Sequence, residues 1–261
     1  MPLTMRARTW TCPRNHSFDI ARSGYLNLLQ PQDRRSREPG DPRQALEARA
    51  RLLAAGIGQR VLDAFVRRAA AALASSGGAV ADLGCGFGDA LGLLCEHREV
   101  AAVGIDLAAP AVDVAARRYP AVTWVAANAD RRLPLVDGSV SLIVSLHARR
   151  NPAECQRVIP PGGHLLVAVP APEDLIELRE AVQGTAVARP RAATVVTEHE
   201  SGFVVVDRGH ASEQHRLGSQ HLQDLLRGTY RGERAREAER VRGLDDLTVT
   251  LATDFVLLRR R

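Results

Sequence analysis

The sequence of 261 residues contains no lysine, only four cysteines, 4% aromatic residues and no long apolar run. Because a bilayer-spanning helix needs about 20 consecutive apolar residues, no membrane span is predicted. The first ten residues lack the apolar stretch of a secretory signal, so we expect a cytoplasmic protein. In that compartment four scattered cysteines are expected to remain thiols and form no disulfide framework.

Every basic residue is arginine, and the excess positive charge lies at the N-terminus. The formal net charge is +5, and residues 1–37 hold seven arginines against two aspartates. Such a segment attracts phosphate backbones, although a solvated surface run is the alternative. We predict an RNA-binding arm whose candidate contacts are Arg14, Arg22, Arg34, Arg35 and Arg37.

Three regions are expected along the chain. Residues 1–40 show no regular period and predict a small basic arm, whereas Asp41 as N-cap followed by Pro42 predicts a helical linker over residues 41–76. Residues 77–261 alternate strand and helix patterns, which predicts a mostly parallel sheet with helices on both faces. Strands are expected near residues 79–83, 100–105, 121–126, 140–145, 163–169, 203–206 and 247–258, and helices near 89–97, 110–118, 152–158, 173–182, 219–227 and 233–242.

The strongest signal is the segment V-A-D-L-G-C-G-F-G-D, which begins at Val80 where a strand turns into a helix. Its glycines allow a tight turn and let a ligand approach the bare backbone, and the following helix points its positive end at that ligand. Asp106 follows eighteen residues after Gly88, at the end of the next strand, where a carboxylate can accept ribose hydroxyls. A glycine turn that serves only packing is the alternative.

The spacing D-x-G-x-G-x-G differs from the G-x-G-x-x-G of dinucleotide-binding proteins and resembles motif I of class I methyltransferases. The resemblance implies an α/β Rossmann-like fold with a seven-stranded sheet, and S-adenosyl-L-methionine as cofactor. The residues expected to bind it are Asp82, Gly84, Cys85, Gly86, Phe87, Gly88, Asp106, Leu107 and Asn128.

The N-terminal segment makes the resemblance more specific. The sequences C-P-R-N-H-S-F-D at residues 12–19, G-Y-L-N-L-L at 24–29 and R-S-R-E-P-G-D at 35–41 resemble the RlmA family. That family methylates N1 of a guanine in a hairpin loop of 23S ribosomal RNA, and one branch contributes to macrolide resistance. The resemblance therefore implies a methyltransferase that acts on such a hairpin, and it leaves a homodimer open.

The resemblance also implies a zinc module of the form C-x2-C…C-x3-H. Cys12 and His16 match its second half, whereas no cysteine stands among residues 1–11 to match the first pair. Structural zinc takes four ligands, so half a site remains and we do not expect zinc to be bound.

Other departures from the family surround the predicted cofactor site. Phe87 stands where many members have glutamate, and the family has an aromatic residue near Gly58 and a histidine near Asp174. These changes keep two alternatives open: a small-molecule methyltransferase of secondary metabolism, and a non-catalytic RNA-binding relative. For removal of the guanine N1 proton, His147 and Asp174 are the candidate catalytic residues.

Overall fold

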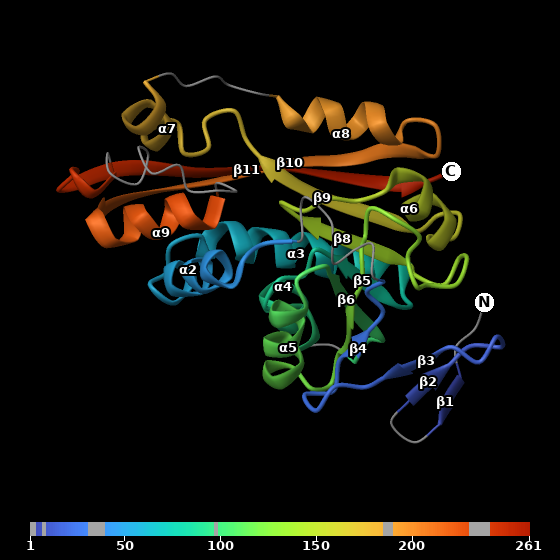
Figure 1. Ribbon diagram of the computed structural model, residues 1–261. Helices are drawn as coiled ribbons and strands as arrows, with labels where there is room; N and C mark the ends of the chain where they lie inside the picture. The colour runs from blue at the N-terminus through green and yellow to red at the C-terminus, as the bar shows by residue number, and fades with distance from the viewer. Residues whose placement is uncertain (1–3, 7–8, 31–39, 97–98, 185–189, 230–240) are drawn as a thin grey trace.

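The computed structural model describes residues 4–6, 9–30, 40–96, 99–184, 190–229 and 241–261, and it contains two sheets (Figure 1). The first 27 residues contribute β1 (Thr4–Arg6), β2 (Thr9–Thr11), β3 (Ser17–Asp19) and β4 (Leu26–Asn27). The remaining strands are β5 (Val80–Leu83), β6 (Ala102–Asp106), β7 (Thr123–Ala126), β8 (Leu142–Leu146), β9 (His164–Pro170), β10 (Phe203–Gly218) and β11 (Asp246–Arg260). The helices are α2 (Arg43–Ala54), α3 (Gln59–Ser76), α4 (Asp89–Glu96), α5 (Ala109–Arg118), α6 (Pro152–Val158), α7 (Ile176–Gln183), α8 (Arg191–His199) and α9 (Ser219–Thr229).

The main sheet has eight strands in the order β10-β11-β9-β8-β5-β6-β7-β4. The six strands from β9 to β4 are mutually parallel, and β11 and β10 add an antiparallel pair at one edge. All four residues of β5 are buried, as expected of a parallel strand with helices on both faces. The predicted α/β Rossmann-like fold is confirmed.

Two apolar clusters cover the faces of this sheet. One joins α3, α4 and α5 to the strands through side chains such as Phe65, Val112 and Trp124. The other joins α6 and α8 to the opposite face through residues such as Val158 and Val195. A third cluster packs α2, α7 and α9 around the outer halves of β10 and β11, and so builds a layer beyond the carboxyl ends of the parallel strands (Figure 1).

The N-terminal segment is more ordered than its sequence suggests. Its first three strands form a small antiparallel sheet in the order β1-β2-β3. Leu26 then enters the main sheet, where it pairs in parallel with Val125 and is 8% exposed. The main sheet therefore has eight strands, one more than the seven expected. The additional strand, β4, has only two residues and so shows no alternating pattern in the sequence. The proposed division at residue 40 stays a prediction.

Three further expectations differ from the structure. The N-cap of α2 is Pro42 and carries no side-chain cap, so the prediction of an Asp41 cap was wrong; Asp41 pairs with Arg49. The strand expected at 203–206 continues to Gly218, and α8 was not foreseen. Most of the helix expected at 233–242 lies outside the described residues. Among the helices that the structure describes, none is long and apolar enough to cross a membrane.

The packing of β4 predicts that the N-terminal segment contributes to the stability of the main sheet. Leu26→Ala removes a buried side chain, so we expect the free energy of unfolding to fall by about 2 kcal/mol or more. Val136→Ala is the matched control, since Val136 is 67% exposed and should change stability by less than about 0.5 kcal/mol. Urea unfolding measures both, and equal midpoints would contradict the packing of β4.

Candidate active site

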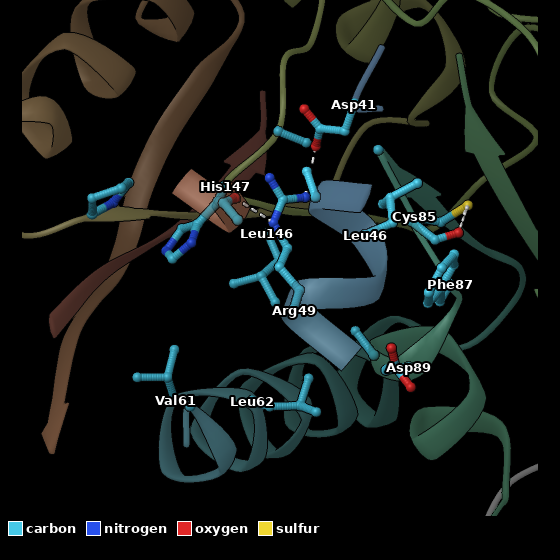
Figure 2. Close-up of a pocket in the computed structure, with 18 of the residues that line it drawn as sticks. Asp41, Leu46, Arg49, Val61, Leu62, Cys85, Phe87, Asp89, Leu146 and His147 are labelled. Atoms are coloured by element: carbon cyan, nitrogen blue, oxygen red, sulfur yellow. Dashed lines mark hydrogen bonds and ion pairs between the residues drawn. The ribbon is translucent and has the colours of Figure 1, made fainter. Parts of the chain in front are cut away.

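A cavity of about 810 Å³ opens at the carboxyl ends of the parallel strands. The loops after β5, β6, β7, β8 and β9 form its floor, and residues of α2 and α9 border it from the other side. Ligands of open parallel sheets bind in this position, outside the carboxyl ends of the strands. Figure 2 shows the part of this cavity around α2, with Cys85 and Phe87 on one side and His147 on the other.

The three glycines after β5 are each required for a different structural reason. Gly84 has φ +76°, and a Cβ there would lie 2.2 Å from Cβ of Ala148. At Gly88 a Cβ would lie 2.5 Å from the ring of Trp124, so this glycine serves packing and does not border the cavity. Gly86 has φ +54° and only a leucine methyl at 3.8 Å, so its backbone stays open to the cavity. The loop therefore offers bare backbone at Gly86.

Asp106 ties the end of β6 to this glycine loop. Its Oδ2 accepts a hydrogen bond from the backbone N–H of Gly86 at 2.8 Å, and its Oδ1 accepts one from Ala108 at 2.8 Å. Burial raises the pKa of Asp106 above its usual range, and the two amide donors offset part of that rise. The carboxylate borders the cavity and keeps lone pairs for further donors.

Asp82 stands beside Asp106 with less support. Its side chain is 2% exposed, and Oδ1 has no hydrogen-bond donor among the described residues. Burial, and secondarily the charge of Asp106, raise the pKa of Asp82 to about 7. A buried carboxylate with an oxygen that lacks a donor is costly in its charged form unless a positive ligand group neutralises it. Asp82 borders the cavity, so the two carboxylate acceptors fit a cofactor that carries an ammonium group and ribose hydroxyls as donors.

The other predicted cofactor residues surround the same space. Cys85, Phe87, Leu107 and Asn128 all line the cavity. Phe87 packs against the cluster of Leu46, Ala108 and Ala111, whereas Oδ1 of Asn128 accepts the backbone N–H of Asp130 at 3.0 Å. Their contacts with a cofactor stay predictions.

The two candidate catalytic residues meet in this cavity although they are 27 positions apart in the sequence. His147 directly follows β8 and has φ +53°, and its Nε2 lies 2.9 Å from Oγ1 of Thr253. Its ring is accessible from the cavity but surrounded by protein; burial, helped by Arg49 and Arg191, lowers its pKa to about 4. Oδ1 of Asp174 accepts the backbone N–H of Ala252 at 2.9 Å, and burial raises the pKa of Asp174 to about 6.

Sequence reasoning missed several residues of the cavity. Arg49 reaches it from α2, Arg191 from the first turn of α8, and Thr253 from the last strand. Of these, only Arg49 could have been singled out from the sequence, because it follows the N-terminal segment that resembles the RlmA family. The sequence does not show that its side chain points into the cavity. Gly58, Phe87 and Asp174, the positions that depart from the family, all line this cavity as well.

The N-terminal candidates are only partly described. Arg14 and Arg22 are exposed on the small sheet and the turn before β4, whereas Arg34, Arg35 and Arg37 lie outside the described residues. Sγ of Cys12 lies 3.4 Å from Nδ1 of His16, so the half-site is assembled. No group of three or more histidine, cysteine or acidic residues suited to a metal occurs among the residues described.

Comparisons with known proteins agree with this geometry. Residues 1–37 match the family described as RlmA, N-terminal, and residues 80–163 match a methyltransferase domain. The chain combines an RlmA N-terminal domain with a methyltransferase domain. The half-site of Cys12 and His16 thus lies within the first of these domains, and the Gly84–Gly88 loop within the second.

Two relatives extend the match over most of the chain. A 23S rRNA (guanine(748)-N(1))-methyltransferase of Streptomyces fradiae is 38% identical over 69% of this chain and 64% of its own length. A candidate 23S rRNA (guanine-N(1)-)-methyltransferase of Micromonospora griseorubida is 35% identical over 66% of this chain and 62% of its own. The chain therefore spans less than two thirds of the length of these relatives.

Solved structures share the fold. The [4+2]-cyclase SpnF matches with a TM-score of 0.53 and 18% identity, over 78% of this chain and 82% of its own. A candidate methyltransferase from Bacillus halodurans matches with a TM-score of 0.50 and 15% identity, over 73% and 97%. Because one of these proteins is named a cyclase, the fold alone does not identify the reaction.

The burial of Asp82 predicts a pH-dependent cost in the ligand-free protein. Its folded pKa of about 7 exceeds the ordinary 3.8, so the cost of its charge is absent below about pH 4 and complete above about pH 7. Asp82→Asn should therefore raise the free energy of unfolding at pH 8 by about 1 to 4 kcal/mol and leave it unchanged at pH 4. Urea unfolding at both pH values measures this, with exposed Asp207→Asn as control; equal stability of Asp82→Asn and wild type at pH 8 would refute it.

Proposed function

We propose that this protein transfers a methyl group from S-adenosyl-L-methionine to N1 of a guanine in a hairpin loop of 23S ribosomal RNA. The observation that carries the proposal is one cavity in which the Gly86–Asp106 contact lies near two candidate bases. The RlmA N-terminal match and the printed names of the two relatives support RNA as the substrate. With ribosomal RNA as its substrate, the proposal places this protein in the cytoplasm.

Several residues of the cavity would hold the cofactor, which supplies an electrophilic methyl group on a sulfonium. Asp106 would accept the ribose hydroxyls, and the backbone at Gly86 would lie against the cofactor. Asp82 would accept the ammonium of the methionine moiety, which gives its unpartnered oxygen a donor. Leu107 and Asn128, at the ends of β6 and β7, would border the adenine. The carboxylates of Asp82 and Asp106 also favour the positive sulfonium of the cofactor over its neutral product.

The guanine must lose its N1 proton as the new bond forms. Asp174 is largely ionised at neutral pH because its pKa is about 6, and its Oδ1 is fixed by the amide of Ala252. His147 is neutral and is oriented through Thr253. A group with a pKa close to the working pH is the more effective base. We therefore assign proton removal to Asp174 and orientation of the base edge to His147.

The basic N-terminal segment would hold the RNA backbone. Arg14 and Arg22 are exposed and free to follow phosphates, and the arginines at 34, 35 and 37 add charge to the same segment of the sequence. Contacts of this kind give affinity without sequence specificity and weaken as salt rises. A zinc ion is not part of the proposal, and the homodimer and the link to macrolide resistance stay predictions.

The proposed reaction leaves a methyl group on the Watson–Crick edge of a guanine, which stops reverse transcriptase. We expect purified protein with cofactor to create a primer-extension stop in unmodified 23S rRNA, first to be sought at the guanine named for the Streptomyces fradiae relative. Asp106→Ala should lower the rate at least about 100-fold, because it removes the ribose acceptor and frees the glycine loop. Exposed Asp207→Ala should retain activity.

Two results would contradict this proposal. Methylation of small molecules with no stop in any 23S hairpin would favour a small-molecule methyltransferase. Binding of hairpin RNA by a protein that binds no cofactor would favour a non-catalytic relative.

The choice of base predicts a pH profile. With Asp174 as the base, kcat/KM should fall tenfold per pH unit below about pH 6, as protons bind the carboxylate. Asp174→Asn keeps an acceptor for Ala252 and should lower kcat about 100-fold or more. Single-turnover methylation from pH 5 to 8 measures both. A wild-type rate that stays level down to pH 5 would instead favour His147, whose pKa is about 4.

A further inference from the structure

Arg49 is the positive group that α2 carries into the cavity (Figure 2). Its NH1 lies 2.6 Å from Oδ2 of Asp41, and its Nε donates to the backbone oxygen of Gly228 at 2.6 Å. The side chain remains 48% exposed, although these two contacts fix the guanidinium. The end of α9 and Asp41, which precedes the N-cap of α2, are thus joined through one side chain.

The guanidinium lies between the two ends of the cavity. Its charge lowers the pKa of Asp106 on the cofactor side and the pKa of His147 on the substrate side. Figure 2 shows Arg49 beside Asp41, facing the space next to Leu146 and His147. A cation at this place, close enough to Asp106 to lower its pKa, is suited to an anionic ligand group at the boundary of the two subsites.

Other arginines of the cavity are held in different ways. Arg179 donates to the backbone oxygens of Pro172 and Asp174, and so fixes the loop that carries the candidate base. Arg149 lies 3.5 Å from Asp130 at the cavity edge. Arg49 pairs with Asp41, whose carboxylate lies close enough to Asp106 to raise the pKa of Asp106.

Asp41 is held in that position by the preceding residue. Gly40 has φ +87°, and a Cβ there would lie 3.1 Å from the backbone nitrogen of Ala108. The segment is therefore packed against the start of α5, two residues from Asp106. The carboxylate of Asp41 therefore places a negative charge of the protein itself in the cavity that the cofactor would occupy.

We propose that Arg49 binds the carboxylate of the methionine moiety of the cofactor, and that Asp41 occupies the same guanidinium until the cofactor displaces it. The inference rests on the proposed function, because it assumes that the cavity takes S-adenosylmethionine. The methionine moiety carries an ammonium and a carboxylate, so Asp82 and Arg49 together match both charges. Binding then exchanges one carboxylate for another on Arg49, and the position of Asp41 becomes coupled to occupancy of the cavity.

Calorimetric titration with two probes tests this proposal. S-adenosylhomocysteine carries the carboxylate, whereas decarboxylated S-adenosylhomocysteine keeps the ammonium, ribose and adenine but lacks it. Wild type should bind the first at least about tenfold more tightly, as expected for a charge-assisted hydrogen bond. Arg49→Gln should lose that preference by weakening only the complete probe. Arg43→Gln is the matched control, because Arg43 lies on the same helix, is 73% exposed and pairs with Glu47.

Asp41→Asn tests displacement independently, with the opposite sign. Removal of the competing charge should tighten binding of S-adenosylhomocysteine several-fold and leave the decarboxylated probe unchanged. The proposal is overturned if Arg49→Gln weakens both probes equally, or if it weakens neither and instead lowers affinity for hairpin RNA. It is also overturned if Asp41→Asn weakens binding of the complete probe. Failure of wild type to bind either probe would instead refute the proposed function.

Discussion

The contact between the carboxylate of Asp106 and the backbone N–H of Gly86 holds the site together. It joins the end of β6 to the loop after β5, and the second oxygen of Asp106 caps the turn into α5 through Ala108. Without an acceptor at this place, the open backbone at Gly86 would lose its fixed direction. Backbone hydrogen bonds from Gly84 and Cys85 to Ile105 join the same two strand ends, and the Asp106 side chain extends this connection to the open backbone of Gly86.

The same arrangement concentrates negative charge. Asp82 is buried and Asp106 is partly buried, each has a raised pKa, and Asp82 also lacks a donor for one oxygen. The free protein bears this cost at neutral pH, and a ligand with positive charge removes it. Asp41 adds a third carboxylate, which Arg49 neutralises. In the ligand-free cavity the charge of Asp41 is therefore neutralised by Arg49. The charge of Asp82 is left for the ammonium group of the proposed cofactor to neutralise.

Sequence reasoning located the parts of this site that depend on local pattern. The strand before Gly84, the glycine turn and the carboxylate of Asp106 follow from buried strands and fixed spacing, and the structure places them as expected. His147 was named from its position at the carboxyl end of a strand, and Asp174 lies near a position where the family has histidine; the structure brings both to the cavity. Their roles and those of the cofactor residues stay predictions.

Features that depend on tertiary contacts were missed. Leu26 and Asn27 form a strand because they pair with the edge of β7, and two residues alone are too few for a strand to be predicted from the sequence. Asp41 has the sequence of a helix cap, but an ion pair with Arg49 takes its carboxylate. The direction of Arg49 depends on the packing of α2 against α9, which no spacing within α2 reveals. In each case the partner is distant in sequence.

The most direct test of the account is to locate the cofactor on the folded protein. Ultraviolet cross-linking of methyl-labelled S-adenosylmethionine, followed by tryptic digestion, should label the peptide of residues 69–98, which contains Cys85, Gly86 and Phe87. Excess S-adenosylhomocysteine should prevent the labelling, and Asp106→Ala should abolish it. Label that is confined to another peptide, or that survives competition, would contradict the claim that this cavity binds the cofactor.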